Sequence, residues 1–588
     1  MSDTQTATAA VSPHLGNPHL GNPHAGNPHA GNPHAGNPHA GNSHAGNSHA
    51  GNSHAGNSHA GNSHAGNSHA GDATGTAAAF PIRLEPRAAF ETLRLALQRA
   101  DYDETTVAKR LGGTYLTGVP RLREGRKTLG GEVTDANAVC IRLFIDGERL
   151  PADLVRQLLG DDAYDACIAL TLLKAANDDA THLLASVLLS PIRGLWLASD
   201  RVPLPAEHEQ VQPQDFVFSA INELTGHFLD AIAAAPGADV LELCAGTGVA
   251  ALLAVKRGAA TAVAADITPR CVHFARFNVL LNGMEDRVRV VESDCWSALE
   301  GETFDMIVAH PPYVPALAHK FDFRDGGGDG ESVSRAIIEG IPAHLRRGGR
   351  VVLRAAFSDR KGITIAQRIR GWLGAAADEH DLVQLEALEY GPMDAYKTVT
   401  KGGAGFVDLE LWLRHFAALG VERFAICILE LRREAFGRAP VTERRVLGKF
   451  LSPGSADWHF RWAHYYASAG STAAERLVGQ TPRVPAGARL AVHLISDAEG
   501  SWRNMVAMVE TDWPAHGVVK APPLLPTLLE LCDGTRALDA LLAGLHDAGL
   551  IDDEVGPTEI ANLLEFLAAA GALELPACPL PPRPEWRP

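Results

Sequence analysis

Paired cysteines, long apolar runs and positive charge are all scarce in this 588-residue chain. Its eight cysteines form no Cys-x-x-Cys pair, which argues against a structural zinc site or a disulfide framework and favours reduced thiols. No apolar run reaches about 18 residues, the length of a membrane-spanning helix, and no secretory signal is visible. We therefore expect a cytoplasmic protein that contacts no membrane.

Positive charge is outnumbered, with 52 lysines and arginines against 69 aspartates and glutamates and a formal net charge of −17. This excludes a molecule that binds nucleic acid through its overall charge, although a local basic patch stays possible. Apolar residues make up an ordinary 46% of the chain. The length is sufficient for about three domains, and nothing in the sequence indicates an oligomeric state.

The N-terminal segment has almost nothing to bury. Residues 13–72 are twelve pentapeptides of the form Pro/Ser-His-Ala/Leu-Gly-Asn, the last ending in aspartate. Such a segment has no apolar core to offset the loss of chain entropy, so we predict that residues 1–79 are disordered. The regular histidines leave two interpretations, metal binding or an expanded repeat without a role.

Residues 80–205 are predicted to form a small helical domain of winged-helix-like type. Helical spacing of apolar residues predicts helices at 88–100, 103–112, 136–144, 151–159 and 161–173. Residues 191–200 would supply the wing strands. One interpretation is nucleic-acid recognition through a modest basic cluster, Arg121, Arg123, Arg126 and Lys127. The alternative is a packing or substrate-positioning domain, because nearby acidic residues dilute the cluster.

Residues 436–588 are predicted to form a second α+β domain, also winged-helix-like. Strands are expected at 489–495 and 504–509, and helices at 524–531, 537–548 and 559–570. The sequence does not indicate a role for this domain.

The central region, residues 206–435, carries the strongest pattern. Four apolar runs predict buried parallel strands, and each run leads into polar or aromatic residues. In chain order, these strand ends are Glu242 with the Gly246-x-Gly248 turn, Asp266, Ser293-Asp294-Cys295, and His310-Pro311-Pro312-Tyr313. Because the carboxyl ends of parallel strands meet at one edge of a sheet, we expect these groups to face one crevice.

The chemistry of these strand ends indicates a nucleoside-containing ligand. Glycine in the turn lets the backbone approach a ligand closely. Asp266 is well placed to accept hydrogen bonds from two ribose hydroxyls. Asp294 is well placed to accept a hydrogen bond from the amino group of an adenine. A dinucleotide site is the alternative, because Gly246-x-Gly248-x-x-Ala251 also fits that fingerprint.

These motifs resemble the class I S-adenosylmethionine (SAM) methyltransferases, and more narrowly the HemK/PrmC-type small-domain N-methyltransferases. The pieces that carry the resemblance are 242–248, 266–269, 278–283, 310–315 and the glycine-rich block 325–330. They span roughly residues 212–434, well under half of the chain. The resemblance implies an α/β fold, a seven-stranded Rossmann-like sheet flanked by small helical domains, with SAM as cofactor.

The resemblance also implies roles for individual residues. Implied cofactor-binding residues are Glu242, Cys244, Gly246, Gly248, Asp266, Ile267, Asp294, Cys295 and His310. Implied acceptor-binding residues are His310, Pro311, Pro312 and Tyr313, of which His310, Pro311 and Tyr313 are the catalytic candidates. Phe216 would lie over the cofactor, and Asp325 and Asp329 would shape a lid or turn. No metal site is expected.

Two residues depart from the family pattern. Cys244 stands where the family usually has glycine, and we interpret it as a packing residue. His310 stands where the family has an asparagine, whose side chain accepts hydrogen bonds from the NH₂ group of the acceptor together with the following proline carbonyl. A neutral imidazole offers one acceptor nitrogen and also the capacity to take a proton.

The leading hypothesis is a SAM-dependent N-methyltransferase that acts on an amide or aromatic amine nitrogen of a protein or nucleic acid. One alternative is methylation of a small metabolite or peptide natural product, with the flanking domains binding the substrate. The other is a degenerate, non-catalytic SAM-binding scaffold, in which Cys244 and His310 would mark lost catalysis.

Overall fold

The computed structural model describes residues 80–119, 129–176, 178–201, 212–401, 408–434, 439–446, 455–468, 472–496, 498–511, 513–514 and 517–581. The predicted disordered segment 1–79 and the basic cluster at 121–127 lie outside these residues, so both stay predictions. Within the described ranges, no helix combines the length and apolar character needed to cross a membrane.

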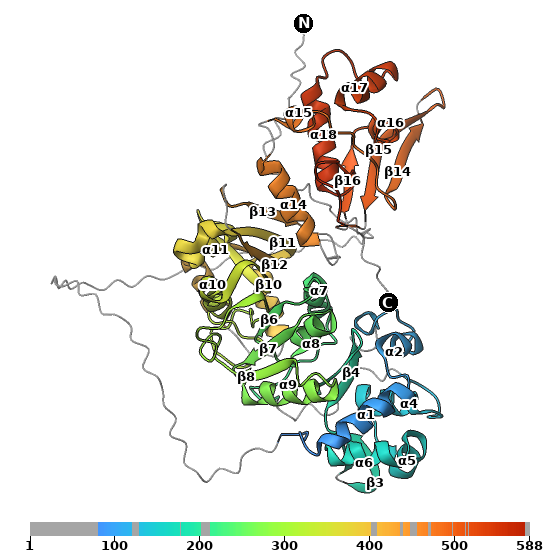
Figure 1. Ribbon diagram of the computed structural model, residues 1–588, viewed down its shortest axis with the longest axis vertical. Helices are drawn as coiled ribbons and strands as arrows, with labels where there is room; N and C mark the ends of the chain where they lie inside the picture. The colour runs from blue at the N-terminus through green and yellow to red at the C-terminus, as the bar shows by residue number, and fades with distance from the viewer. Residues whose placement is uncertain are drawn as a thin grey trace, which may run out of the picture. The chain divides into compact units, whose positions relative to one another are not determined.

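A large mixed sheet organises the centre of the described chain (Figure 1). Its strand order is β13 (Thr442–Val446), β11 (His380–Tyr390), β12 (Val421–Arg433), β10 (Leu345–Arg360), β9 (Phe304–Ala309), β6 (Asp239–Leu243), β7 (Thr261–Asp266) and β8 (Val288–Glu292). Strands β6 to β10 run parallel, and β12 is antiparallel to both of its neighbours. The predicted α/β fold class is confirmed.

In the described residues this sheet has eight strands, one more than the seven predicted from the sequence. The additional strand, β13, pairs in parallel with β11. Arg444 of β13 donates two hydrogen bonds of 2.8 Å to the buried carboxylate of Glu386 on β11, which also binds Arg423 of β12. The short run Thr-Glu-Arg-Arg-Val has little apolar signal, and this ion-pair network adds to its backbone pairing with β11.

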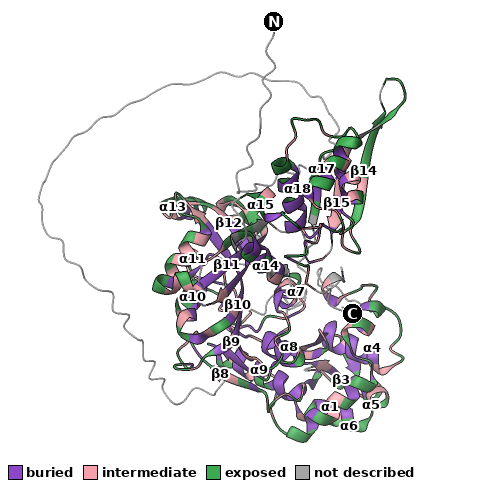
Figure 2. Ribbon diagram, turned by 45° about the horizontal axis from the view of Figure 1, so that its top comes forward, coloured by how far each residue is buried: buried purple, intermediate pink, exposed green. Residues whose placement is uncertain are grey.

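Both faces of the sheet are covered by helices (Figure 1). Val240 of β6 packs with α8 (Val249–Lys256) and α9 (Pro269–Leu281), whereas Leu241 packs with α10 (Ser332–His344) and α11 (Ile365–Leu373). This alternation continues across the strands, and Figure 2 shows buried residues running through the sheet and the inner faces of these helices. A parallel sheet buried on both faces explains why the strands read as continuous apolar runs.

The described part of the N-terminal region contains the expected helices and a strand hairpin. The helices are α1 (Arg87–Arg99), α2 (Glu104–Arg110), α4 (Ala136–Cys140), which continues as a π-helical turn (Ile141–Ile145), α5 (Ala152–Leu159) and α6 (Asp161–Ala169). A three-stranded sheet orders β1 (Leu150–Pro151), β3 (Asp179–Ala185) and β2 (Leu173–Ala176), and β4 (Leu188–Ile192) pairs with β5 (Leu195–Ser199). The helix predicted at 161–173 ends earlier, because the chain enters β2 at Leu173.

Two asparagines join this hairpin to α9, one of the helices that cover the central sheet. Asn278, on α9, accepts the N–H of Ala198 at 2.7 Å and donates to its carbonyl at 3.0 Å. Asn282, one helical turn later, makes the same pair of bonds with Trp196 at 3.0 and 2.8 Å. Residues two apart on a strand and four apart on a helix are similarly spaced. The two amide groups therefore satisfy the outer edge of β5 as a neighbouring strand would.

The C-terminal part has its own apolar core. It contains α14 (Ser455–Ser468), α15 (Ala473–Arg476), the sheet β14 (Arg489–Ser496)–β15 (Trp502–Thr511)–β16 (Gly517–Ala521), and α16 (Leu525–Leu531), α17 (Leu538–Asp547) and α18 (Pro557–Ala569). The three predicted helices are confirmed, whereas the two predicted strands are part of a three-stranded sheet. Strand β14 is exposed along almost all of its length (Figure 2). The domain boundaries stay a prediction.

Candidate functional site

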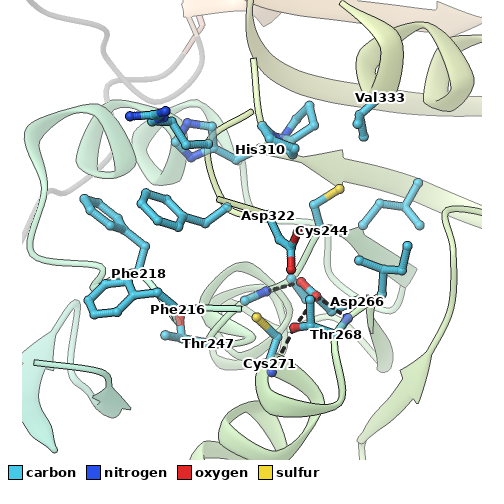
Figure 3. Close-up of a pocket in the computed structure, with 18 of the residues that line it drawn as sticks. Phe216, Phe218, Cys244, Thr247, Asp266, Thr268, Cys271, His310, Asp322 and Val333 are labelled. Carbon is cyan, nitrogen blue, oxygen red and sulfur yellow. Dashed lines mark hydrogen bonds between the residues drawn. The ribbon is translucent and has the colours of Figure 1, made fainter. Parts of the chain in front are cut away.

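A cavity of about 720 Å³ lies at the carboxyl ends of β6, β7, β8 and β9 (Figure 3). Strand β6 has β7 on one side and β9 on the other, so the connections leave it in opposite directions and open a crevice at this edge. Helix α7 (Glu223–Ala231) and the segments 215–220 and 319–325 form the opposite wall.

The structure brings nearly all of the sequence-predicted residues together here. Those that line the cavity are Glu242, Cys244, Gly246, Asp266, Ile267, Asp294, Cys295, His310, Pro311, Pro312 and Tyr313. Gly248 does not line it. Gly248 is the N-cap of α8, with φ 75°, and a Cβ there would lie 3.3 Å from the Cβ of Ala275 on α9. This glycine therefore permits close packing of α8 against α9.

Asp266 holds the glycine turn in place. Its Oδ2 accepts the N–H of Gly246 at 2.8 Å, and its Oδ1 accepts the N–H of Thr268 at 3.0 Å (Figure 3). Burial raises the pKa of this carboxyl. Oδ1 also accepts the hydroxyl of Thr268 at 3.3 Å, whereas Oδ2 has a second lone pair that can accept a hydrogen bond from a ligand in the cavity.

The carboxylate of Glu242 is used inside the fold. It accepts the N–H groups of Ala250 at 3.1 Å and Ala251 at 2.8 Å, in the first turn of α8, where free N–H groups favour negative charge. Burial raises its pKa to about 8. Glu242 thus orients α8 behind the glycine turn. From the sequence alone, this role could not be told apart from cofactor binding.

The backbone explains why glycine is usual at position 244. Cys244 has φ 54°, in the left-handed region, where a side chain costs about 1–2 kcal/mol and glycine costs little. Burial raises the pKa of the Cys244 thiol well above its usual range, so the thiol stays protonated. Both observations agree with a packing residue and disagree with a nucleophile.

The far end of the cavity is formed by His310 and Tyr313. The two rings are nearly parallel, with centroids 5.8 Å apart and an interplanar angle of 18°. Phe228, from α7, packs 5.4 Å from the imidazole on another side. Burial, helped by the positive charge of Arg354, lowers the pKa of His310 to about 3. The imidazole is therefore uncharged at neutral pH and has an acceptor nitrogen.

The glycine-rich block wraps around the segment that follows His310. The N–H of Gly326 bonds to the carbonyl of Val314, and the N–H of Val314 bonds to the carbonyl of Arg324, both at 2.9 Å. A Cβ on Gly326 would lie 2.7 Å from the carbonyl oxygen of Pro312, so only glycine fits against this backbone. The block therefore supports the backbone beside the cavity.

The two aspartates of this block are engaged in local structure, as expected. Asp325 accepts the N–H groups of Lys320 and Phe321 at 2.7 and 2.9 Å. Asp329 pairs with Arg360 of β10 at 2.7 Å. Neither geometry suits a catalytic base.

Two aromatic residues of the site were not predicted from the sequence. Phe218 and Phe323 both line the cavity and stack with centroids 5.3 Å apart and an interplanar angle of 13°. Phe216, which was predicted to lie over the cofactor, also lines the cavity and packs 5.7 Å from Phe323. The available signal was the repeated Phe-x-Phe pattern at 216–218 and 321–323, whose two halves are about a hundred residues apart.

Comparison with known proteins identifies the domain that holds this cavity. Residues 211–361 match the methyltransferase small domain family. This small domain covers about a quarter of the chain and contains every cavity residue described above. The resemblance predicted from the motifs is confirmed for this region, and with it the predicted class of the domain, a methyltransferase domain.

Individual relatives agree with this assignment of the small domain. A release factor glutamine methyltransferase of Cereibacter sphaeroides is 38% identical over 141 residues, which cover 22% of this chain and 50% of the relative. A ribosomal protein uL3 glutamine methyltransferase of Bradyrhizobium diazoefficiens is 34% identical over 125 residues, which cover 19% of this chain and 39% of the relative. The chain thus spans half or less of the length of these relatives.

A comparison of structures includes a SAM-dependent methyltransferase from Agrobacterium tumefaciens. It is 16% identical and aligns over 43% of this chain and 71% of that protein, with a TM-score of 0.27.

Proposed function

We propose that this chain is a SAM-dependent N-methyltransferase whose acceptor is the side-chain amide of a glutamine in a protein. The observation that carries the proposal is the His310-Pro311-Pro312-Tyr313 segment, held beside the cavity of a methyltransferase small domain with an uncharged imidazole. The relatives are named as glutamine methyltransferases of release factors and of ribosomal protein uL3, which favours a protein acceptor over a nucleic acid or a metabolite.

The residues of the cavity fit SAM. Oδ2 of Asp266 has a lone pair for a ribose hydroxyl, and Asp294 reaches the cavity from the end of β8. Ile267, beside Asp266, is 54% exposed, so it offers an apolar surface on which a flat adenine can lie. When bound, SAM supplies an activated methyl group.

The chain's own residues would hold the acceptor and exclude water. The Pro311 carbonyl and the neutral imidazole of His310 are both hydrogen-bond acceptors for the two N–H bonds of an amide, and the ring of Tyr313 offers a face for the flat amide group. The aromatic wall of Phe216, Phe218 and Phe323 shields the cavity from solvent. Fixing the nitrogen in line with the methyl group is the main catalytic contribution expected of such a site.

Labelled methyl transfer tests this proposal. The purified protein is incubated with methyl-labelled SAM and a bacterial cell extract, which is then separated into protein, RNA and small molecules. We expect the label in protein, and mass spectrometry should place it on glutamine. Label only in RNA or small molecules would contradict the protein acceptor. SAM binding without any transfer would support a non-catalytic scaffold, and Asp266→Ala serves as the control for cofactor dependence.

A further inference from the structure

Arg354 is a buried arginine next to the acceptor end of the cavity. It lies on β10, whose residue Leu353 pairs with Ala309, the last residue of β9. Arg354 is therefore in register with His310. The preceding pair on this face, Val308 and Val352, belongs to the core under α7 and α8. His310 and Arg354 thus lie side by side on the same face of the sheet, because side chains on a strand alternate between faces.

In the part of the chain that the structure describes, no carboxylate pairs with the guanidinium of Arg354. Its side chain is fully buried, and in the described ranges its one hydrogen-bonding partner is the neutral phenol of Tyr313. The groups whose charges act on it are the Tyr313 phenol and the Cys427 thiol, neither of which is a carboxylate. A buried, unpaired cation costs several kcal/mol of folding free energy, so its retention at a site indicates a function.

The unpaired charge acts on the ionisable groups around it. Besides burial, Arg354 lowers the pKa of His310 and also that of His227 on α7. The acids of α7, Glu223 and Asp230, raise the pKa of His227 and have no such action on His310. Burial raises the pKa of Tyr313, and Arg354 opposes that rise.

Tyr390, on β11, is another phenol near Tyr313. Its pKa is raised by burial and, to a smaller extent, by Tyr313 and Cys427. Among the described residues, no carboxylate acts on the pKa of His310.

We propose that Arg354 is a positioning residue of the site that binds the methyl-accepting amide. Its fixed positive charge keeps the imidazole of His310 unprotonated, so that a ring nitrogen can accept a hydrogen bond from the N–H of that amide. This inference rests on the proposed function for the identity of the acceptor. As the acceptor nitrogen forms its bond to the methyl carbon, the methyl–sulfur bond breaks and the nitrogen is left with a surplus proton. His310 takes that proton and passes it to water, because an imidazolium beside Arg354 is unstable.

A titration of His310 tests this role without a substrate. Protein carrying ¹³C-labelled histidine is followed by NMR from about pH 4 to about pH 9, which brackets an ordinary histidine pKa of about 6.5. The His310 signal is assigned by its loss in His310→Asn. In the wild type we expect no titration of His310 above about pH 5. In Arg354→Met the midpoint should move upward, short of the ordinary value because burial remains, and in Arg354→Lys it should stay low.

An ordinary midpoint in the wild type, or the same midpoint in Arg354→Met as in the wild type, would overturn the role of Arg354. If Arg354→Met melts at too low a temperature for titration, Arg354→Gln also removes the charge and should show the same upward shift. Calorimetry should show unchanged SAM affinity in Arg354→Lys.

The methyl-transfer assay separates the two proposals. With a glutamine acceptor found, the rate of Arg354→Met should fall more steeply from about pH 8 to about pH 6 than that of the wild type, because a growing fraction of His310 is protonated. If the His310 midpoint shifts upward in Arg354→Met but no methyl label enters protein, the glutamine acceptor is rejected and the role of Arg354 is kept. Label on glutamine with an ordinary His310 titration would reject the role of Arg354 alone.

Discussion

At the scale of single residues, the carboxylate of Asp266 both holds the glycine turn, through the N–H of Gly246, and faces the cavity. Its removal should therefore affect both the turn and the ligand.

We expect Asp266→Ala to weaken SAM binding by tenfold or more, about 1.4 kcal/mol, measured by calorimetry. Asp239→Ala is the matched control. Asp239 begins β6 at the opposite edge of the sheet, where it binds Thr261 at 2.6 Å and Arg346 at 2.9 Å. That variant should bind SAM as the wild type does. Equal affinity in Asp266→Ala and Asp239→Ala would contradict the assigned role.

His310 gives a prediction about acid stability. Its pKa is lowered to about 3 in the folded protein, so between about pH 6.5 and pH 3 the unfolded chain binds the extra proton and the folded protein does not. The contribution of His310 to stability is thus present above about pH 6.5 and lost as the pH falls. We expect His310→Asn to lose less stability than the wild type between about pH 7.5 and pH 4.5 in urea unfolding. An equal loss would show that His310 titrates normally.

At the scale of elements, the glycine-rich block and the segment 312–315 form one unit. A Cβ on Gly326 would meet the carbonyl oxygens of Gly330 at 2.4 Å and Pro312 at 2.7 Å, both backbone atoms. Substitution there must move the segment that carries Tyr313.

We expect Gly326→Ala to lower kcat by about tenfold or more, because small displacements of an acceptor site are costly. Gly371→Ala is the control. Gly371 lies inside α11 with open space around its Cβ position, so alanine should raise stability by about 0.5–1 kcal/mol through helix propensity. Unchanged kcat in a folded Gly326→Ala protein would show that the block does not position the acceptor site.

Glu331 ties the same block to β10 and α11. Its carboxylate, 1% exposed, accepts the N–H and hydroxyl of Ser358 at 2.6 and 2.9 Å and pairs with Arg360 and Arg368. We expect Glu331→Ala to cost about 3–5 kcal/mol, because the buried N–H of Ser358 and the half-buried guanidinium of Arg368 lose their carboxylate partner. Arg360 keeps its pair with Asp329. Thermal unfolding measures this effect. The control Glu339→Ala breaks only the exposed pair with Arg335 and should stay within about 0.5 kcal/mol of the wild type.

At the scale of the whole molecule, the N-terminal hairpin is joined to the methyltransferase small domain through α9. Asn278 is fully buried and also donates to the carbonyl of Thr247, which lines the cavity, at 2.9 Å. The hairpin and the cavity therefore share one hydrogen-bonded residue.

We expect Asn278→Ala to lower the free energy of unfolding by about 3 kcal/mol, because the N–H and carbonyl of Ala198 lose buried partners. Asn282→Ala, at a half-buried position, should cost less. Chemical denaturation measures both. A loss of SAM affinity in Asn278→Ala that exceeds the one in Asn282→Ala would confirm the link to Thr247, and equal affinities would contradict it.

Much of the site follows from the sequence, because the chemistry of a parallel sheet is local. An apolar run followed by Asp266 or His310 places that residue at the carboxyl edge wherever the strand lies in the sheet. The contacts that Glu242 and Gly248 make with α8 and α9 did not follow, because they depend on how these helices sit against their neighbours. Strand β13 was missed because its sequence has no apolar periodicity, and its ion pair with Glu386 joins residues far apart in the chain.

The sequence by itself determined the α/β class, the strand ends that carry the site and the family of the small domain, since these depend on residues close together in the chain. Only the tertiary structure decided which distant residues meet. In its strand, Arg354 is one polar residue in an apolar run, and the pairing of β9 with β10 places it beside His310. The physical reason is that strand register and helix packing set such contacts, and no local pattern encodes them.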